Sequence, residues 1–366
     1  MRILSTISKI VVLAFFITGC KQSTDTIENL NEDKEDSLKI NEETAWYVEP
    51  KIIQGLTQGT TFTIKTSDDT LYLSPEEINT LFSEFDRELS GYIPNSLVSQ
   101  FNASDSLMIT ETKFFQDCYM QSMEVYEKTK GAFDPSVFPL VKAWGFFQDI
   151  ENPPSENIID SILEFTGFKE GLHHVMKDGK LIKKDKRFQL DFNAIAQGQS
   201  VDAVANYLDE KGQMNYFIEI GGEIRVKGVN NENNLWVIGI DEPVPNNTGQ
   251  GARKLENYLG LTNISVATSG SYRKFYEKNG KKYSHTIDPK TGRPVEHNLL
   301  STTVISKKAS TADAYATAFM AMGVEKTLEF IQSNPQLNLE VYLLFQNKEG
   351  RIERAYSRGV PNFLLN

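Results

Sequence analysis

Asp313 and Thr317 are the two residues of this sequence whose types and spacing best suit metal chemistry. They are four positions apart in the alanine-rich stretch Ser310–Thr317, so a helix would place a carboxylate and a hydroxyl on one face. Hard oxygen donors of this kind suit Mg²⁺, which takes one or two carboxylates together with substrate phosphates. A structural interpretation is equally open, because Ser310 and Asp313 also have capping-box spacing and Thr317 could bond back to a backbone carbonyl.

His285 is the second candidate, within the turn-rich segment Val266–Val295. A small-residue turn is expected at Thr268–Gly270, and Asn279–Gly280 predicts a two-residue hairpin between strand-like runs. The return strand would carry His285 into a second turn-dense stretch at Asp288–Pro294. Turns on a rigid scaffold hold side chains in fixed directions, which suits chemistry. A half-buried structural histidine fits the same pattern.

Three further stretches combine a turn or a junction with polar groups. Gly131–Pro135 is expected to end a helix and to present Phe133 and Asp134 together. Leu190–Gly198 predicts a strand that breaks into a helix, where free backbone N–H and C=O groups can meet a phosphate or a metal. Gly221–Gly222 lies between two expected strands, where a planar ligand could stack on bare backbone.

The elements that must position these residues alternate between strands and helices. Ser74 followed by Pro75 predicts a helix start, and Asp178–Gly179 predicts a hairpin turn. Strands are expected near 59–65, 216–220, 223–227 and 235–240, that hairpin spans 175–182, and helices are expected near 74–89, 111–130, 198–211 and 311–322. This interleaving, without an internal repeat, predicts a single α+β domain with a large and mostly hairpin-built sheet.

Composition and missing motifs exclude several classes of function. The 366 residues are 40% hydrophobic, enough for a sizeable core, and the formal net charge of −11 argues against nucleic acid as a general partner. The glycine-rich phosphate loops G-x-G-x-x-G and G-x-x-x-x-G-K are absent, as are G-x-S-x-G, H-E-x-x-H and C-x-x-C. The four histidines have no zinc-site spacing; they are His173, His174, His285 and His297.

The N-terminus has the features of a targeting segment. Arg2 and Lys9 precede an apolar run at 10–17, and small residues then lead to Cys20. The run is too short to span a bilayer permanently. The arrangement resembles a bacterial lipoprotein signal over residues 1–20, in which Cys20 carries the lipid; a plain secretory signal is the alternative.

Residues 21–50 are expected to form a disordered tether, and residues 51–366 the folded domain. The tether carries nine acidic residues against three lysines, and so polar a segment cannot bury enough surface to offset its ordering entropy. Within the domain, Cys118 lies on the apolar face of an expected helix and is predicted to be a buried, unreactive thiol. With Cys20 lipidated, no intramolecular disulfide is available.

Eight motifs occur in an order and spacing that closely resembles the ApbE-type FAD:protein FMN transferases, over roughly residues 56–330. They are Gly59–Phe62, Ser90–Tyr92, GAFDPSV (131–137), LDFNAIAQGQSVD (190–202), EIGGEIR (219–225), VATSGSYR (266–273), YSHTIDPKTGRPV (283–295) and ADAYATAFMAMG (312–323). Members of that family use Mg²⁺ and FAD to attach FMN to Thr or Ser of acceptor proteins through a phosphoester bond, releasing AMP. They are often bacterial lipoproteins, which agrees with the N-terminal signal.

The resemblance implies a role for individual positions. Asp313 and Thr317 would bind Mg²⁺ through their side chains and Ala194 through its carbonyl, and His285 would be the catalytic base. The FAD site would be lined by Tyr92, Ala132, Phe133, Asp134, Asp191, Gln197 and Ile287.

This chain departs from the family at Gln197, where many members have Lys, and at Gln58, where a Met is common. Asn95–Leu97 also replaces a more usual Asp-Ser-Glu. The first two departures bear on the affinity for FAD rather than on the reaction.

The resemblance also implies partners and a location. Acceptors in the family include redox-pump subunits and exported flavoproteins with a short Asp-Gly-x-Thr/Ser site. The protein would be lipid-anchored in the bacterial cell envelope and face the periplasm, with the inner or outer membrane left open. Two alternatives remain, an FAD pyrophosphatase that releases FMN and AMP, and a flavin-binding lipoprotein without turnover. Gln197 favours the carrier, whereas His285, Asp313 and Thr317 favour an enzyme.

Overall fold

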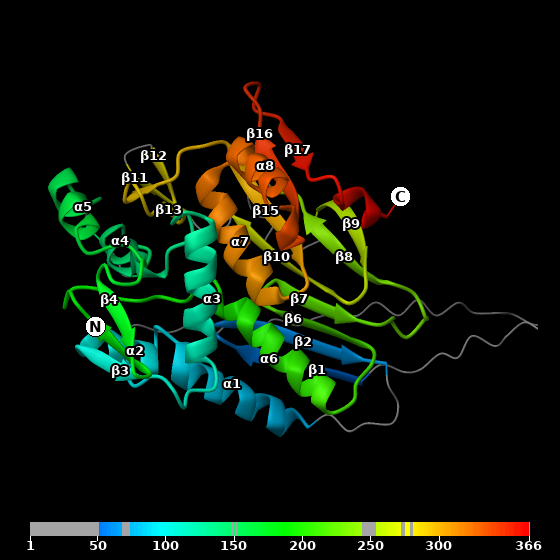
Figure 1. The fold of residues 1–366 in the computed structure, drawn as a ribbon. Coiled ribbons are helices and arrows are strands. Elements are labelled where there is room, and N and C mark those ends of the chain that lie inside the picture. The colour runs from blue at the N-terminus through cyan, green and yellow to red at the C-terminus, as the bar shows by residue number, and fades with distance from the viewer. Residues whose placement is uncertain are drawn as a thin grey trace, which may run out of the picture. The chain divides into compact units, whose positions relative to one another are not determined.

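An eight-stranded antiparallel sheet runs through the computed structural model of the chain (Figure 1). Its order is β1 (Lys51–Thr57), β2 (Thr60–Thr66), β6 (Tyr216–Ile220), β7 (Glu223–Lys227), β10 (Ile264–Gly270), β15 (Leu299–Ser306), β16 (Glu340–Gln346) and β17 (Ile352–Tyr356). The structure describes residues 51–67, 74–147, 150, 152–243, 254–271, 275–278 and 281–365, with only the backbone at 275–278, 281 and 282. All of them belong to one compact unit, Ala45–Asn366.

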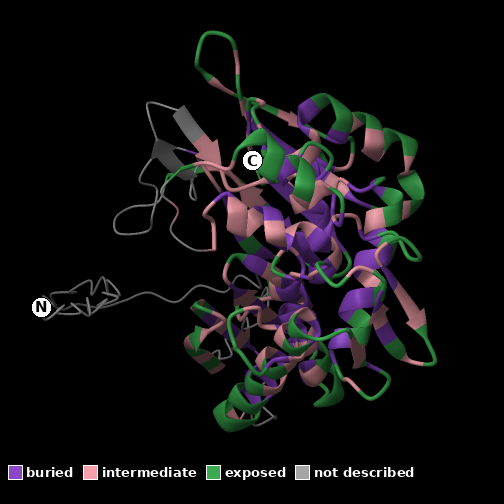
Figure 2. Cartoon of the chain, turned by 90° about the vertical axis from the view of Figure 1, so that its left-hand side faces the viewer, coloured by how far each residue is buried: buried purple, intermediate pink, exposed green. Residues whose placement is uncertain are grey.

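Helices cover one face of this sheet. They are α1 (Pro75–Leu89), α2 (Leu97–Ala103), α3 (Phe115–Lys128), α6 (Ala196–Glu210), α7 (Ala309–Met322) and α8 (Val324–Ser333). Helix α6 packs on β6 and β7, α7 on β10 and β15, and α8 on β16. The main hydrophobic core lies between these helices and the sheet, where Figure 2 shows the buried residues concentrated.

A two-stranded hairpin, β8 (Trp236–Asp241) and β9 (Leu255–Leu261), contributes to a second core. Alternate side chains along a strand point to opposite faces of the sheet. In β15, Val304 therefore faces the helices, while its neighbour Ile305 packs with Trp236 and Ile238 in the second core. The sheet is thus buried on both faces from β7 to β16, which gives α7 a rigid support.

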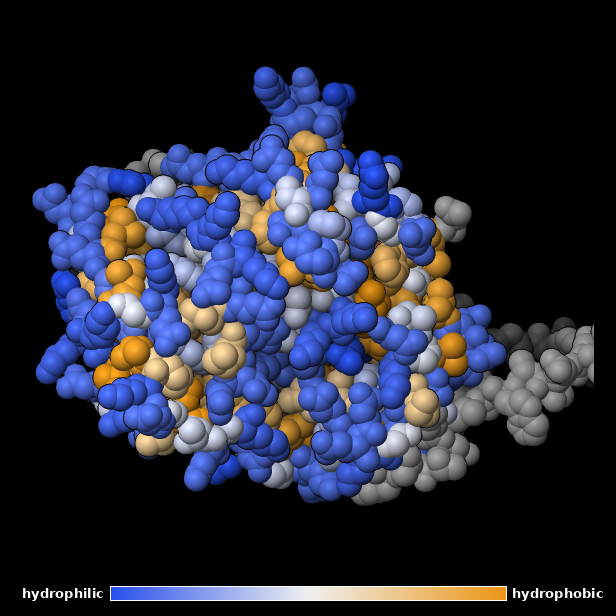
Figure 3. All heavy atoms as spheres, in the orientation of Figure 1, coloured by the Kyte–Doolittle hydropathy of each residue, from blue (hydrophilic) through white to orange (hydrophobic). Residues whose placement is uncertain are grey.

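Smaller elements form the rest of the domain. Short strands are β3 (Ser106–Met108), β4 (His174–Lys177), β5 (Lys180–Lys183), β11 (Phe275–Lys278), β12 (Lys281–Ser284), β13 (Ile287–Asp288) and β14 (Arg293–Pro294). Short helices are α4 (Phe138–Ala143), α5 (Glu156–Leu163), η1 (Pro135–Val137), η2 (Pro335–Leu337) and η3 (Val360–Asn362). None of the described helices is long and apolar enough to cross a membrane. The face in Figure 3 is mostly hydrophilic with scattered hydrophobic patches.

The predicted α+β class is confirmed, and so are most of the local signals. The Ser74 hydroxyl accepts the N–H of Glu77 at 3.2 Å and caps α1. Asp178 and Gly179 both have positive φ and join β4 to β5. The predicted hairpin pairs β11 with β12, although Asn279–Gly280 itself lies outside the described residues, as do residues 1–50 with Cys20 and the tether. Cys118 is a buried free thiol, as expected, and burial raises its pKa.

Three local predictions are wrong. Thr268–Gly270 is the end of strand β10 rather than a turn, because it pairs with Ser301–Thr303 of β15. The helix expected from 111 starts at Phe115, since the Glu88 carboxylate accepts the N–H groups of residues 113 to 115. Leu190 is not in a strand. The Asn102 carboxamide donates to its carbonyl and accepts its N–H, the two bonds that a neighbouring strand would make.

Candidate active site

The start of α6 leaves one backbone carbonyl open. In a regular helix the N–H of Gly198 would donate to the carbonyl of Ala194, four residues earlier. Here it donates to Oδ2 of Asp313 on α7, at 3.0 Å. Within the described part of the chain, no backbone hydrogen bond from another residue reaches the Ala194 oxygen. That oxygen is available to a cation.

Asp313 is a carboxylate buried between α6 and α7. Its exposed fraction is 6%, and burial raises its pKa to about 7 although the Gly198 N–H acts in the opposite direction. Buried charges in proteins are normally paired or bound to metals. A cation beside the second carboxylate oxygen would therefore stabilise the ionised form.

Thr317 lies one turn further along α7, on the same face as Asp313. Its Oγ1 is 3.5 Å from Oγ of Ser269 on β10, and the described residues show no bond from it back to a helix carbonyl. The capping-box interpretation is also wrong, because the Ser310 hydroxyl donates to Asp202 of α6 at 2.6 Å. The structural alternatives for this motif are thereby removed.

These three oxygen donors fit Mg²⁺. A backbone carbonyl, one carboxylate and one hydroxyl are hard ligands, and Mg²⁺ usually keeps waters and binds substrate phosphates besides one or two carboxylates. The described residues contain no cluster of three or more His, Cys, Asp or Glu side chains that could hold a metal ion. A site with a single carboxylate is consistent with that finding, and it would leave positions for the phosphates of a nucleotide.

Two of the predicted flavin-binding carboxylates are joined through the backbone. Asp134 Oδ1 accepts both the N–H and the hydroxyl of Ser136, at 2.8 and 2.6 Å. The N–H of Asp191 donates to Pro135 O at 2.8 Å, and Asp191 Oδ1 accepts the N–H of Asn193 at 2.8 Å. Burial raises the pKa of each carboxyl to about 6. The turn Gly131–Pro135 after α3 is therefore bonded to the segment Leu190–Asn193 before α6. We call the surface that these two segments form the wall.

Tyr92 belongs to the same wall. Its hydroxyl accepts a 3.5 Å hydrogen bond from Asn193, and its ring stacks on Phe147 with centroids 5.2 Å apart. The tyrosine is 67% exposed, so one aromatic surface remains open to a planar ligand. Ala132 is half-buried, but Phe133 is almost completely buried, with its ring in the main core.

Gln197 lies on the other side of the α6 start. A Cβ added to Gly221 would overlap its carboxamide, so this side chain rests on the diglycine turn between β6 and β7. Gln58, at the turn between β1 and β2, accepts a hydrogen bond from Ser200 of α6 at 3.2 Å. Gln58 and Gln197, two of the positions that depart from the pattern of the family that the sequence resembles, therefore both lie at the first turns of α6.

His285 and Ile287 come from a separate segment. Strand β10 brings Ser269 to Thr317, and the chain then continues through β11 and β12 to His285, which is half-buried. Ile287 packs with Leu140 and Trp144. Its loop is held by a 2.7 Å hydrogen bond from Trp144 Nε1 to Gly292 O. The histidine thus lies on a turn-rich segment fixed to α4, as its sequence context predicted.

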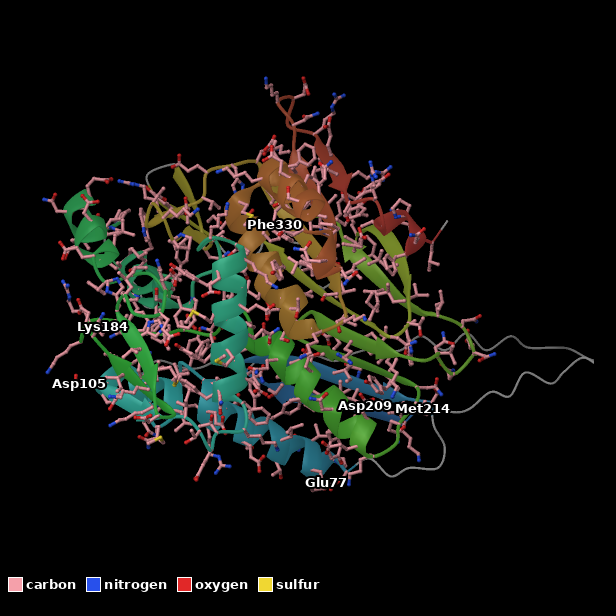
Figure 4. The ribbon with its side chains drawn as sticks, in the orientation of Figure 1. Glu77, Asp105, Lys184, Asp209, Met214 and Phe330 are labelled. Carbon is pink, nitrogen blue, oxygen red and sulfur yellow. The ribbon has the colours of Figure 1, made fainter. Side chains whose placement is uncertain are left out.

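Further contacts hold α6 and α7 in place. Asp209 near the end of α6 accepts Lys227 Nζ at 2.8 Å and the Tyr216 hydroxyl at 3.2 Å. Phe330 of α8 packs on Tyr315 and Phe319 of α7, with centroids 5.8 and 5.5 Å apart (Figure 4). The two helices next to the oxygen donors are therefore attached to the sheet and to α8.

A surface depression between α1 and α6 is not this site. It lies at the C-terminal end of α6, away from Ala194 and Gly198, where Figure 4 labels Glu77. Its lining includes three glutamates, Glu76, Glu77 and Glu84, which would repel a pyrophosphate.

Three groups that form hydrogen bonds at the candidate site were not identified from the sequence. The Gly198 N–H, the Ser269 hydroxyl and the Asp202 carboxylate each act across a contact between elements far apart in the chain. Only Gly198, the first residue of the helix expected at 198–211, carried a signal, because a glycine in a helix costs stability unless close packing requires it. A Cβ there would overlap Ala309 O and lie 2.8 Å from Asp313 Cβ.

Comparison with known proteins identifies the family of this chain. The sequence matches the model of the ApbE family over residues 58–343. The FAD:protein FMN transferase of Haemophilus influenzae is 34% identical over 323 residues, covering 84% of this chain and 91% of that protein. The FAD:protein FMN transferase of Vibrio cholerae is 34% identical over 319 residues, covering 84% of this chain and 91% of that protein.

Solved structures show the same architecture. The flavin transferase ApbE from Vibrio cholerae superposes with a TM-score of 0.75 and 30% identity, covering 86% of this chain and 99% of the other. The apo form of the flavinyl transferase ApbE from Pseudomonas stutzeri gives a TM-score of 0.75 and 29% identity, covering 86% and 96%.

Proposed function

The chain belongs to the ApbE family, and we propose that it transfers FMN from FAD to a Thr or Ser hydroxyl of an acceptor protein in a Mg²⁺-dependent reaction. The observation that carries this proposal is the arrangement at the α6–α7 contact. Gly198 is bonded to Asp313 instead of to Ala194, which leaves a carbonyl, a carboxylate oxygen and the Thr317 hydroxyl as donors for one cation.

The reaction exchanges the phosphoanhydride linkage of FAD for a phosphoester linkage to the acceptor. The acceptor hydroxyl oxygen attacks the FMN phosphorus and forms a new P–O bond, and the bond from that phosphorus to the bridging oxygen of the pyrophosphate breaks. The hydroxyl proton passes to the base, and AMP leaves with the bridging oxygen. A neutral hydroxyl is a weak nucleophile, so a positioned base is needed to remove its proton.

In this proposal Asp313, Thr317 and the Ala194 carbonyl would hold the cation. Bound Mg²⁺ would neutralise charge on the phosphates of FAD. Asp313 is suited to this because its carboxylate is already desolvated and held by the Gly198 N–H.

The wall that contains Asp134, Asp191 and Tyr92 would bind the rings of FAD. Buried carboxylates can accept hydrogen bonds from N–H groups of a flavin or adenine, and the exposed Tyr92 ring offers a stacking surface. Gln197 would contact the ligand through a neutral carboxamide. We expect this contact to make a smaller and less salt-dependent contribution to binding than an ammonium would.

His285 would be the base that accepts the acceptor's proton. An unperturbed imidazole has a pKa near neutrality, which suits this role. Its position on a segment held by the bond between Trp144 and Gly292 would keep the ring oriented.

The proposal is tested with the full-length protein in detergent, FAD, Mg²⁺ and an acceptor domain bearing an Asp-Gly-x-Thr site. The matched control is the same domain with that threonine changed to valine. The expected result is a fluorescent acceptor band that survives denaturation, requires Mg²⁺, is absent with the control acceptor and has the mass of one added FMN.

Other products would decide for the alternatives. Free FMN and AMP, formed at the same rate with either acceptor, would make the protein an FAD pyrophosphatase. Intact FAD bound one-to-one without turnover would make it a flavin carrier. Either outcome contradicts the transferase.

We also propose that Cys20 is lipidated and that the enzyme acts on exported or membrane flavoproteins from the periplasmic side of the cell envelope. The support is the sequence of residues 1–20 and the acidic tether at 21–50. Labelling of growing cells with a fatty-acid analogue should mark the protein, and Cys20→Ser should abolish the label and release the protein from the membrane fraction. Membrane retention of the unlabelled variant would contradict the anchor.

A further inference from the structure

Asp202, on α6, binds the N-terminus of α7 with both of its carboxylate oxygens. Oδ1 accepts the N–H of Ala309 at 3.0 Å, and Oδ2 accepts the N–H and the hydroxyl of Ser310, at 3.0 and 2.6 Å. Asp202 is only 9% exposed. The first N–H groups of a helix lack intrahelical partners, and an anion there is also stabilised by the helix dipole. No side chain of α7 itself caps this end.

The contact between the two helices follows one register. On α6, Gly198 and Asp202 are four positions apart, and Ala194 lies just before the helix; on α7, Ala309, Asp313 and Thr317 are four apart. Asp202 touches Ala309, and Gly198 lies against both Ala309 and Asp313. The two helices run in opposite directions at this contact, because Asp202 bonds to Ala309 and Gly198, one turn earlier on α6, bonds to Asp313, one turn later on α7. Ala194 precedes Gly198 just outside α6, and Thr317 follows Asp313 on α7. The cation donors lie at one end of this register and Asp202 at the other.

Arg225 holds Asp202 in place from the sheet. Its guanidinium lies 3.0 Å from Asp202 Oδ1 and also donates to Lys307 O, immediately before α7, at 3.0 Å. The carboxylate is thereby attached to β7 as well as to both helices. A shift of α7 along its axis would break these bonds together.

We propose that Asp202 is the positioning residue that sets α7 against α6 and thereby sets the affinity of Ala194, Asp313 and Thr317 for a divalent cation. This inference rests on the proposed function of that site. Asp202 itself does not touch the cation. It acts by keeping the donors of two helices at the separation that one small ion requires, a demand that is strict for Mg²⁺ because of its near-ideal octahedral geometry.

The chain offers a matched control for such a role. Glu88 of α1 likewise accepts three N–H groups at the start of a helix, those of Lys113, Phe114 and Phe115 of the α3 start, at 2.9, 2.8 and 2.8 Å. Helix α3 carries none of the proposed cation donors. Loss of either carboxylate should lower the melting temperature, but only loss of Asp202 should change cation binding.

The experiment titrates Mn²⁺, as a probe for the site, into the full-length protein without FAD and measures free Mn²⁺ by electron paramagnetic resonance. Wild type is compared with Asp202→Asn, Ser310→Ala, Glu88→Gln and Asp313→Ala, with melting temperatures taken in EDTA. An Asn would turn an NH₂ group toward N–H donors, so we expect Asp202→Asn to raise the Kd for Mn²⁺ about ten- to a hundred-fold. Ser310→Ala removes one of the bonds and should give a smaller rise. Glu88→Gln should keep the wild-type Kd.

Two results would overturn the inference, and they differ in their meaning. If Asp202→Asn and Glu88→Gln both melt earlier but bind Mn²⁺ like wild type, Asp202 is a structural cap only and the proposed function stands. If wild type and Asp313→Ala bind Mn²⁺ equally, the cation site itself is absent and the proposed function fails with it. Should Asp202→Asn not fold, Ser310→Ala decides the question by the same comparison.

Discussion

The backbone N–H of Gly198 donates a hydrogen bond to Oδ2 of Asp313, with 3.0 Å between nitrogen and oxygen. This single bond links α6 to α7, orients a buried carboxylate and withdraws the donor that would otherwise occupy the Ala194 carbonyl. The proposed binding of a cation depends on this bond, because it leaves the Ala194 carbonyl oxygen without its helical donor.

Gly198→Ala should destabilise the protein and impair transfer. In an exposed helix the change would add stability, but here the new Cβ would overlap Ala309 O and lie 2.8 Å from Asp313 Cβ. We expect a loss of about 1–3 kcal/mol in the free energy of unfolding, typical of overpacking, measured by urea denaturation. Gly91→Ala, where a Cβ meets nothing within 4 Å, is the control for stability. Equal midpoints for the two variants would contradict the packing argument.

His285→Ala should abolish FMN transfer and leave FAD binding intact. Loss of a positioned base is expected to lower kcat on the order of 10²- to 10⁴-fold, measured with a protein acceptor, while calorimetry should give an unchanged Kd for FAD. His297→Gln is the matched control, because His297 has structural partners, with Nε2 2.7 Å from Met320 O and Nδ1 accepting the Leu299 N–H. Its loss should lower the melting temperature and spare kcat. Wild-type transfer by His285→Ala would remove the histidine from the mechanism.

Asp313→Ala should eliminate activity together with the response to Mg²⁺. The variant lacks the only carboxylate among the proposed donors, so neither raising Mg²⁺ nor adding EDTA should change its residual rate or its melting temperature. The wild-type protein should show both responses. A variant that still responds to Mg²⁺ would place the cation elsewhere.

Thr317→Val should raise the Mg²⁺ concentration needed for half-maximal activity, whereas Thr317→Ser should not. Valine keeps the shape of threonine but removes the hydroxyl, and serine keeps the oxygen that lies near Ser269. We expect a change of roughly ten-fold for valine, the lower end of what loss of a well-placed metal contact costs. Identical Mg²⁺ curves for the two variants would exclude the hydroxyl as a ligand.

Asp134 should make the stability of the ligand-free protein depend on pH. Burial raises the pKa of its carboxyl in the fold to about 6, from an ordinary value of 3.8. Between these values the folded state binds more protons than the unfolded state, so the free energy of unfolding falls as pH rises from about 4 to 6, by up to ~3 kcal/mol. Below 3.8 the carboxyl is protonated in both states.

Asp134→Asn removes this titration, and its Oδ1 can still accept both bonds from Ser136. The melting temperature of the variant minus that of wild type should therefore increase from pH 4 to pH 7. Other carboxyls, including Asp191, titrate in both proteins and cancel in the difference. A difference that stays constant with pH would show that ionisation of Asp134 does not destabilise the folded state.

Features set by neighbouring residues could be predicted from the sequence. The Ser74 cap, the Asp178–Gly179 turn and the spacing of Asp313 and Thr317 depend on interactions within a few positions, so their patterns identify them directly. The class of fold followed from the order of such elements, and the family followed from motifs that keep their spacing along most of the domain.

Contacts between distant elements could not be predicted in this way. The capping-box spacing of Ser310 and Asp313 suggested a local bond, but Asp202, more than a hundred positions earlier, binds the start of α7 instead. Likewise Leu190 has no strand partner, because the carboxamide of Asn102 satisfies its backbone. A backbone N–H or C=O bonds to whichever group the packing brings nearest, and the packing depends on the whole chain. The sequence by itself therefore determined which groups are available for chemistry, and the tertiary structure decided how they are paired.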